Sequence, residues 1–192
     1  MKTEDVLREF EEAGALLRGH FILTSGRHSD TYLNKSIVST DPQRTERLCR
    51  ALAEKIEDAV GKPDIVVSPA MGAIVFGYET ARHLGTPFMF MERAEGGFAL
   101  RRGFALDPGA RVAIVEDIIS TGLSAGECVA AVRAQGGEPT VLACLIDRSG
   151  GTAKIDAPVV ALAQLNVPTY DPADLPAHLA DIAPVKPGSR GL

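Results

Sequence analysis

Two adjacent acids followed by a stretch rich in hydroxyl groups and glycine form the pattern in this sequence most suggestive of chemistry. Glu116-Asp117 come directly after the apolar run 112–115, and two isoleucines separate them from the Ser-Thr-Gly-Leu-Ser segment 120–124. Carboxylates accept hydrogen bonds from hydroxyl groups, such as the two of a sugar diol, and they are good outer partners for hydrated Mg²⁺. The acid pair therefore predicts a sugar site.

The segment 120–124 suits a phosphate group. It precedes a helix expected over 124–135, so its backbone N–H groups would converge where unpaired donors and the helix dipole favour an anion. Gly122 permits a close approach, and three hydroxyl side chains add donors. The G-x-x-x-x-G-K-[ST] and G-x-G-x-x-G patterns are absent here, which leaves nucleoside triphosphates and NAD without their usual support. A sugar phosphate with a free diol fits both parts of the motif.

Short apolar runs alternate with helical patterns through the middle of the chain, and these elements must position the motif. Strands that are apolar on both faces and alternate with helices are typical of a parallel sheet covered on both sides, so the expected fold class is α/β. Ligands of such sheets bind beyond the carboxyl ends of the strands, where segment 120–124 must lie. The runs are 64–68, 87–91, 111–116, 140–146 and 159–165, and the helices are 41–60, 72–84 and 124–135.

The two ends of the chain do not follow this alternation. Apolar residues at helical spacing predict a helix over 4–17 that stops before Gly19, and extended pieces at 21–23 and 31–33 bracket a turn-prone segment. Five prolines after residue 167 indicate a surface wrap. We expect one domain over 1–192, made of a helix and hairpin hood (1–40), an α/β core (41–166) and a C-terminal wrap (167–192).

Composition restricts the partners and the location. A net charge of −5 offers no basic stripe for nucleic acid, and no apolar run is long enough to cross a membrane, so a cytoplasmic protein is expected. The cysteines Cys49, Cys128 and Cys144 lack metal-ligand spacing and are expected to be buried, reduced thiols. The four histidines show no ligand pairing and suggest ordinary surface or core roles.

Taken together, the strand, the acid pair and the loop resemble the phosphoribosyl diphosphate signature of the type I phosphoribosyltransferases. Three further stretches resemble the orotate phosphoribosyltransferases of this group: the N-terminal segment 21–34, the pyrophosphate loop 68–74 and the Asp147-Arg148 pair. The resemblance runs from the first helix to about Leu165. It implies a central parallel sheet flanked by helices, transfer of a phosphoribosyl group to orotate, Mg²⁺ held mainly through the substrate diphosphate and water, and a homodimer.

The resemblance also implies roles for individual residues. Orotate is expected at Ser25, Gly26, Ser120 and Arg148, because an arginine can meet the acidic edge of the base. Asp117, Glu116, Arg93 and Arg102 are the catalytic candidates. Phosphoribosyl diphosphate is expected at Glu116, Asp117, Ile118, Ile119, Ser120, Thr121, Gly122, Leu123, Ser124, Met71, Gly72 and Arg93.

The sequence departs from the family at its lysines. Many members carry lysine at the positions of Thr24 and Gly72, and a catalytic lysine with a histidine in a longer mobile loop. Here the mobile loop is represented by a Gly-Gly hairpin over 92–104, whose cations are Arg93, Arg101 and Arg102. Arg93 with Arg101 or Arg102 is expected to neutralise the departing diphosphate, in its own or a neighbouring subunit, although Arg101-Arg102 fits a solvated hairpin face equally well.

Two other readings stay open. The acceptor of the phosphoribosyl group could be a purine or uracil instead of orotate. Alternatively, the missing lysines are compatible with a non-catalytic regulator that senses phosphoribosyl diphosphate.

Overall fold

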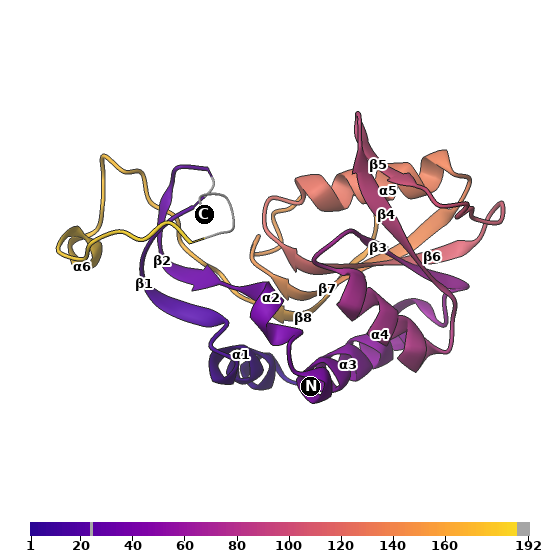
Figure 1. Ribbon diagram of the computed structural model, residues 1–192, viewed down its shortest axis with the longest axis horizontal. Helices are drawn as coiled ribbons and strands as arrows, with labels where there is room; N and C mark the ends of the chain where they lie inside the picture. Colours follow the sequence, from indigo (N-terminus) through magenta and orange to yellow (C-terminus); the bar gives the residue numbers. More distant parts are fainter. Residues whose placement is uncertain (24, 188–192) are drawn as a thin grey trace.

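A mostly parallel six-stranded sheet forms the centre of the molecule in the computed structural model, which describes residues 1–23 and 25–187 (Figure 1). The strand order is β5-β4-β3-β6-β7-β8, and only the β4–β5 pair is antiparallel. The predicted α/β class is confirmed. The strands are β3 (Ile65–Pro69), β4 (Phe88–Ala94), β5 (Gly97–Leu100), β6 (Arg111–Ile119), β7 (Glu138–Asp147) and β8 (Val159–Gln164).

Helices cover both faces of this sheet (Figure 1). Helices α3 (Pro42–Val60) and α4 (Ile74–Leu84) pack on one face, and α5 (Leu123–Ala134) packs on the other. Strand β6 shows how the sheet builds two layers. Ala113 and Val115 belong to the hydrophobic cluster under α3 and α4, whereas Val112 and Ile114 belong to the cluster under α5. The chemistry expected after β6 is therefore carried by a strand buried on both faces.

The cap expected at the start of α3 is present. The Asp41 side chain accepts hydrogen bonds from the backbone N–H groups of Gln43 and Arg44, and Pro42 occupies the first helical position. Helix α4 starts two residues later than expected, because residues 71–73 form a turn between β3 and the helix.

The first helix ends earlier than the sequence pattern predicted. Helix α1 spans Thr3–Glu12, and Gly14 follows it with φ +66°, so that the Ala15 N–H reaches the Phe10 carbonyl at 2.8 Å. This left-handed glycine ends the helix. Leu16 and Leu17, which we placed on the helix, instead begin strand β1 (Leu16–Ile22), because two apolar residues fit either periodicity.

A separate hairpin stands outside the main sheet, as expected. Strand β1 pairs antiparallel with β2 (His28–Leu33), and the short helix α2 (Lys35–Val38), which was not predicted, leads on to α3. The described part of the C-terminal segment, including α6 (Ala177–Ala180), lies along this hairpin (Figure 1). Thr24, where many family members carry lysine, lies outside the described residues. So do residues 188–192, the end of the expected wrap.

Candidate active site

The acid pair lies inside β6, deeper than we expected. Strand β6 continues through Ile118 and Ile119, which pair with Ile146 and Asp147 of β7, so the strand does not end at the acids. Glu116 is 7% exposed and Asp117 is 0% exposed. Buried carboxylates need partners, so their contacts decide what the site can do.

Asp117 is held by a lysine from the hood. The Lys35 ammonium lies 2.7 Å from both carboxylate oxygens, and the Ile118 N–H donates to Oδ1 at 2.6 Å. Sequence reasoning missed Lys35 because it stands 82 residues from Asp117 and belongs to a short helix without a motif. Its side chain is 44% exposed, so the ammonium closes one side of Asp117 and still reaches solvent.

Glu116 differs from an ordinary glutamate in its affinity for a proton. Burial, and then the negative charge of Asp117, raise the pKa of Glu116 well above its usual range. Its Oε1 accepts a hydrogen bond from the Asp117 N–H at 3.1 Å. The pair therefore combines a carboxylate paired with Lys35 and a neighbouring carboxyl that holds its proton more tightly than an ordinary glutamate does. Such a pair can accept hydrogen bonds from sugar hydroxyls and donate hydrogen bonds to them.

The loop after β6 turns its backbone donors toward the start of α5. Gly122 caps α5 with φ +82°, and among the described residues the N–H groups of Ser120, Thr121 and Gly122 have no hydrogen-bond partner. A Cβ atom on Gly122 would lie 2.8 Å from Cβ of Ala153, so only glycine fits both the backbone angle and the neighbouring segment. This arrangement is suited to a phosphate, and phosphate binding here stays a prediction.

The loop that resembles a pyrophosphate loop lies against the acid pair. Met71, which is 83% exposed, and Gly72 connect β3 with α4. A Cβ atom on Gly72 would lie 2.4 Å from Oδ2 of Asp117 and 3.4 Å from the Lys35 ammonium. The parallel strands β3 and β6 thus bring two segments far apart in sequence to one edge of the sheet.

Arg148 lies at the same edge, directly after β7. Its backbone N–H donates to the Ile119 carbonyl at 2.8 Å. Within the described part of the chain its guanidinium forms no ion pair, and its Nε is buried without a hydrogen-bond partner. Burial lowers the pKa of Arg148 while the nearby Tyr32 of β2 raises it. Such a cation is ready for an anionic ligand.

Ser25 and Gly26 lie in the exposed turn of the hairpin. The Gly26 N–H donates to the Leu23 carbonyl at 2.9 Å, and the Ser25 hydroxyl accepts from the Arg27 N–H at 3.4 Å. No hydrogen bond or ion pair among the described residues joins this turn to the edge of the main sheet. Their contact with a base stays a prediction.

Two of the three hairpin arginines form ion pairs with nearby acids. Arg93 pairs with Glu127 of α5 and stacks on the Phe98 ring, with 4.1 Å between its Cζ and the ring centroid. Arg102 pairs with Glu92 at 2.8 Å. Arg101 is exposed and makes no ion pair within residues 1–23 and 25–187. Their action on a diphosphate stays a prediction.

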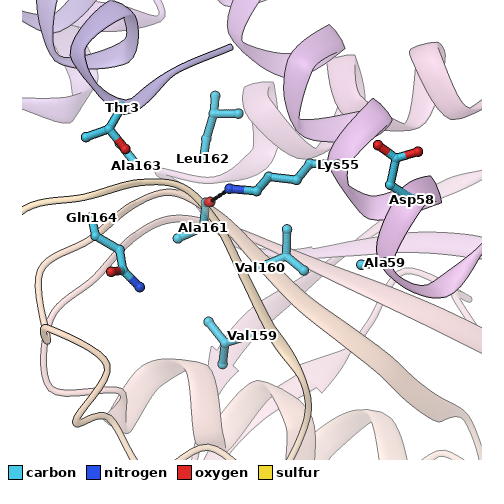
Figure 2. Close-up of a pocket in the computed structure, with 10 residues that line it drawn as sticks. All are labelled: Thr3, Lys55, Asp58, Ala59, Val159, Val160, Ala161, Leu162, Ala163 and Gln164. Carbon is cyan, nitrogen blue, oxygen red and sulfur yellow. Dashed lines mark hydrogen bonds between the residues drawn. The ribbon is translucent and has the colours of Figure 1, made fainter.

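A cleft of about 520 Å³ lies away from these groups, at the outer edge of the sheet. It is formed by α3, the start of α1 and strand β8, and Figure 2 shows the Lys55 ammonium donating to the Ala161 carbonyl across it. None of the predicted site residues lines it. We therefore place the candidate site at the carboxyl ends of β3, β6 and β7 and not in this cleft.

The remaining reactive side chains have structural roles. Cys49, Cys128 and Cys144 are free and buried, as expected, and burial raises the pKa of the Cys49 thiol to about 12. His20 and His28 are buried and hydrogen bonded to each other. No cluster of three or more histidine, cysteine or acidic residues suited to a metal occurs in the described ranges, and no helix there has the length and apolar character needed to cross a bilayer.

Comparison with known proteins decides the family. The family model described as phosphoribosyl transferase domain matches residues 39–173. The chain belongs to the phosphoribosyltransferase family. A relative named orotate phosphoribosyltransferase, from Methylorubrum extorquens (strain PA1), is 59% identical over 100% of this chain and 98% of its own length.

Solved structures show the same phosphoribosyltransferase fold. The orotate phosphoribosyltransferase from Aeropyrum pernix matches with a TM-score of 0.70 and 24% identity over 83% of this chain and 93% of its own. Adenine phosphoribosyltransferase from Saccharomyces cerevisiae matches with a TM-score of 0.67 and 23% identity over 83% of this chain and 99% of its own. Since both bases occur on one fold, the fold alone does not select the acceptor.

Proposed function

We propose that this phosphoribosyltransferase transfers the phosphoribosyl group of phosphoribosyl diphosphate to orotate, forming orotidine 5′-phosphate and diphosphate in pyrimidine nucleotide biosynthesis. Full-length relatives near 60% identity carry this name. The observation that carries the proposal within the chain is Arg148, a largely buried guanidinium with no acidic partner in the described residues. The carboxylate of orotate would supply that partner.

Each part of the substrate has a matching group in the site. Glu116 and Asp117 would hold the ribose hydroxyls, and the donors of segment 120–124 would hold the 5′-phosphate. Met71, Gly72, Arg93 and Arg102 would face the diphosphate. Ser25, Gly26, Ser120 and Arg148 would bind orotate.

The reaction needs no covalent nucleophile on the protein. The ring nitrogen of orotate attacks the anomeric carbon as the bond from that carbon to the diphosphate oxygen breaks, through a transition state with oxocarbenium character, and the proton of that nitrogen passes to water or to the departing diphosphate. The chain contributes by aligning two anions and by stabilising charge on the leaving group. The buried position of the acid pair excludes water from one side of the ribose.

Magnesium fits this chemistry as a cofactor held mainly by substrate. The Asp117 carboxyl lies beside the loop proposed to face the diphosphate, against the position of a Cβ on Gly72. It and Glu116 would act as outer partners of the hydrated ion, whose charge would neutralise the diphosphate.

The assembly and setting proposed for the protein are a cytoplasmic homodimer of single-domain subunits, divided as hood, core and wrap. Val75 and Tyr78 are exposed apolar residues on the first turns of α4, and a contact with a second copy would cover them. Light scattering behind size-exclusion chromatography checks this: a monomer mass at micromolar concentration contradicts it.

A turnover assay tests the acceptor. Purified protein with Mg²⁺ and phosphoribosyl diphosphate should consume orotate, and it should leave uracil, guanine and adenine unchanged. Arg148→Gln should raise KM for orotate about 10-fold or more, the effect of losing a charge-assisted contact. Arg50→Gln is the control, because Arg50 is exposed on α3 and pairs with Glu46.

Two results would contradict the proposal. Turnover with uracil or a purine but not with orotate would assign the protein to another acceptor. Tight binding of phosphoribosyl diphosphate without turnover of any base would favour the regulator.

A further inference from the structure

We infer that Lys35, on the short helix α2, contacts the diphosphate of the substrate and supplies a cation that the family usually provides from the pyrophosphate loop. The inference rests on the proposed function, because it assigns a residue to the leaving group of that reaction. Lys35 belongs to no motif in the sequence.

The position of the Lys35 ammonium carries the inference. It lies 2.7 Å from Asp117 and 3.4 Å from the point where a Cβ on Gly72 would stand. The ammonium thus lies beside both the acid proposed to hold the ribose and the loop proposed to face the diphosphate. A phosphate oxygen bound against the backbone at Gly72 would come within hydrogen-bond range of it.

The space around Gly72 leaves no room for a side chain on the loop. A side chain at this position would strike the Asp117 carboxylate at 2.4 Å and contact the Lys35 stem at 3.4 Å. Asp117 therefore excludes a side chain at position 72 of the loop, and Lys35 of α2 places a cation beside the same point.

Two of the three candidate arginines on the hairpin are already paired with acids, whereas Arg101 is exposed to solvent. Arg93 and Arg102 are engaged with Glu127 and Glu92. Among the described residues Lys35 pairs with Asp117 alone, and its ammonium carries three donors. Its 44% exposed side chain can move from Asp117 to an incoming diphosphate without unfolding α2. This exchange would also free the Asp117 carboxylate for the ribose hydroxyls.

The test measures binding of magnesium diphosphate and of orotidine 5′-phosphate to the full chain by calorimetry. Lys35→Met should weaken diphosphate binding about 10- to 100-fold, the range for one charge-assisted hydrogen bond. Binding of orotidine 5′-phosphate, which lacks a diphosphate, should change less than about 3-fold. Lys35→Arg should restore much of the diphosphate affinity.

Lys62→Met is the matched control, because exposed Lys62 precedes β3 at the opposite, amino-terminal edge of the sheet. It removes the same charge and should leave both affinities unchanged. Unaltered diphosphate binding in Lys35→Met, or equal weakening of both ligands, overturns the inference.

An Asp117→Asn background separates contact with diphosphate from mere pairing with Asp117. If Lys35 only neutralises Asp117, then Lys35→Met has no further effect on diphosphate binding in that background. We expect the same fold-loss as in the native chain. The double variant also lacks the uncompensated buried carboxylate, so it remains foldable if Lys35→Met alone does not.

Diphosphate binding does not depend on which base is accepted. A wild-type protein that binds diphosphate but fails to use orotate would therefore remove the proposed function and leave the Lys35 test valid.

Discussion

At the scale of single residues, a substitution of Asp117 should affect substrate binding much more than folding. Asparagine keeps the shape and one acceptor oxygen but loses the charge, so Asp117→Asn should lower kcat/KM about 10- to 100-fold by weakening a charged hydrogen bond to ribose. Its free energy of unfolding should change by less than about 1 kcal/mol, because the freed Lys35 is partly solvated. Steady-state kinetics and urea unfolding measure both. Unchanged turnover would remove the assignment of the acid pair.

Glu116 should make stability depend on pH. Its folded-state pKa is raised by burial and by Asp117, so the folded protein binds more protons than the unfolded chain between the ordinary glutamate pKa and the raised one. Stability from this group is complete at acidic pH and falls as pH rises through that window.

The Glu116→Gln variant removes this dependence. It should gain stability relative to the native chain as pH rises from 5 to above neutral, by at least about 1.4 kcal/mol, the equivalent of one pKa unit. Urea unfolding at several pH values measures it. A parallel pair of stability curves would contradict the raised pKa.

Sequence reasoning reached some of the site residues and not others for a physical reason. Glu116 and Asp117 form a local pattern with the loop that follows them, and a local pattern can be read from the chain. Lys35 meets Asp117 only because α2 folds back over the sheet edge. A lone lysine 82 residues away carries no local signal of that contact.

At the scale of elements, the turn at Gly122 sets the position of the backbone donors proposed to bind phosphate. Gly122→Ala would place a Cβ 2.8 Å from Ala153 at φ +82°, so the loop must shift. We expect a loss of about 1–3 kcal/mol in unfolding free energy and weaker binding of inorganic phosphate. Gly126→Ala, inside the same helix with open space at its Cβ, should instead stabilise by about 0.5–1 kcal/mol. Similar behaviour of the two variants would contradict the role of Gly122.

Elements of the core could be predicted more accurately than those of the hood. The inner strands β3, β6 and β7 could be predicted from short apolar runs, because they are largely buried on both faces. Helix α1 was predicted too long because Leu16 and Leu17 satisfy helical spacing, and only the left-handed Gly14 shows where the helix ends. The extension of β6 through Ile119 depends on pairing with β7, which no local pattern records.

The hood and the C-terminal segment form one unit at the scale of the whole molecule, and the sequence showed only that both lie outside the core. The Ile22 N–H donates to the Val185 carbonyl at 2.8 Å on one edge of the hairpin, and the His28 N–H donates to the Tyr170 carbonyl at 2.9 Å on the other. The His20 ring is hydrogen bonded to the Ile182 carbonyl at 2.7 Å. These partners come from residues more than 140 positions apart, so local patterns could not predict them.

Removal of residues 168–192 should therefore loosen the hairpin and spare the sheet. A two-stranded hairpin is marginally stable alone, and this one would lose backbone partners on both edges. Hydrogen exchange should quicken in β1 and β2 while β6 and β7 keep their protection, since the core clusters contain no residue from the removed segment. Orotate binding should weaken more than diphosphate binding.

Arg27→Ala, which removes the two side-chain hydrogen bonds to Thr169, should give a smaller effect of the same kind. Full protection of the truncated hairpin would show that it holds its shape without the C-terminal segment.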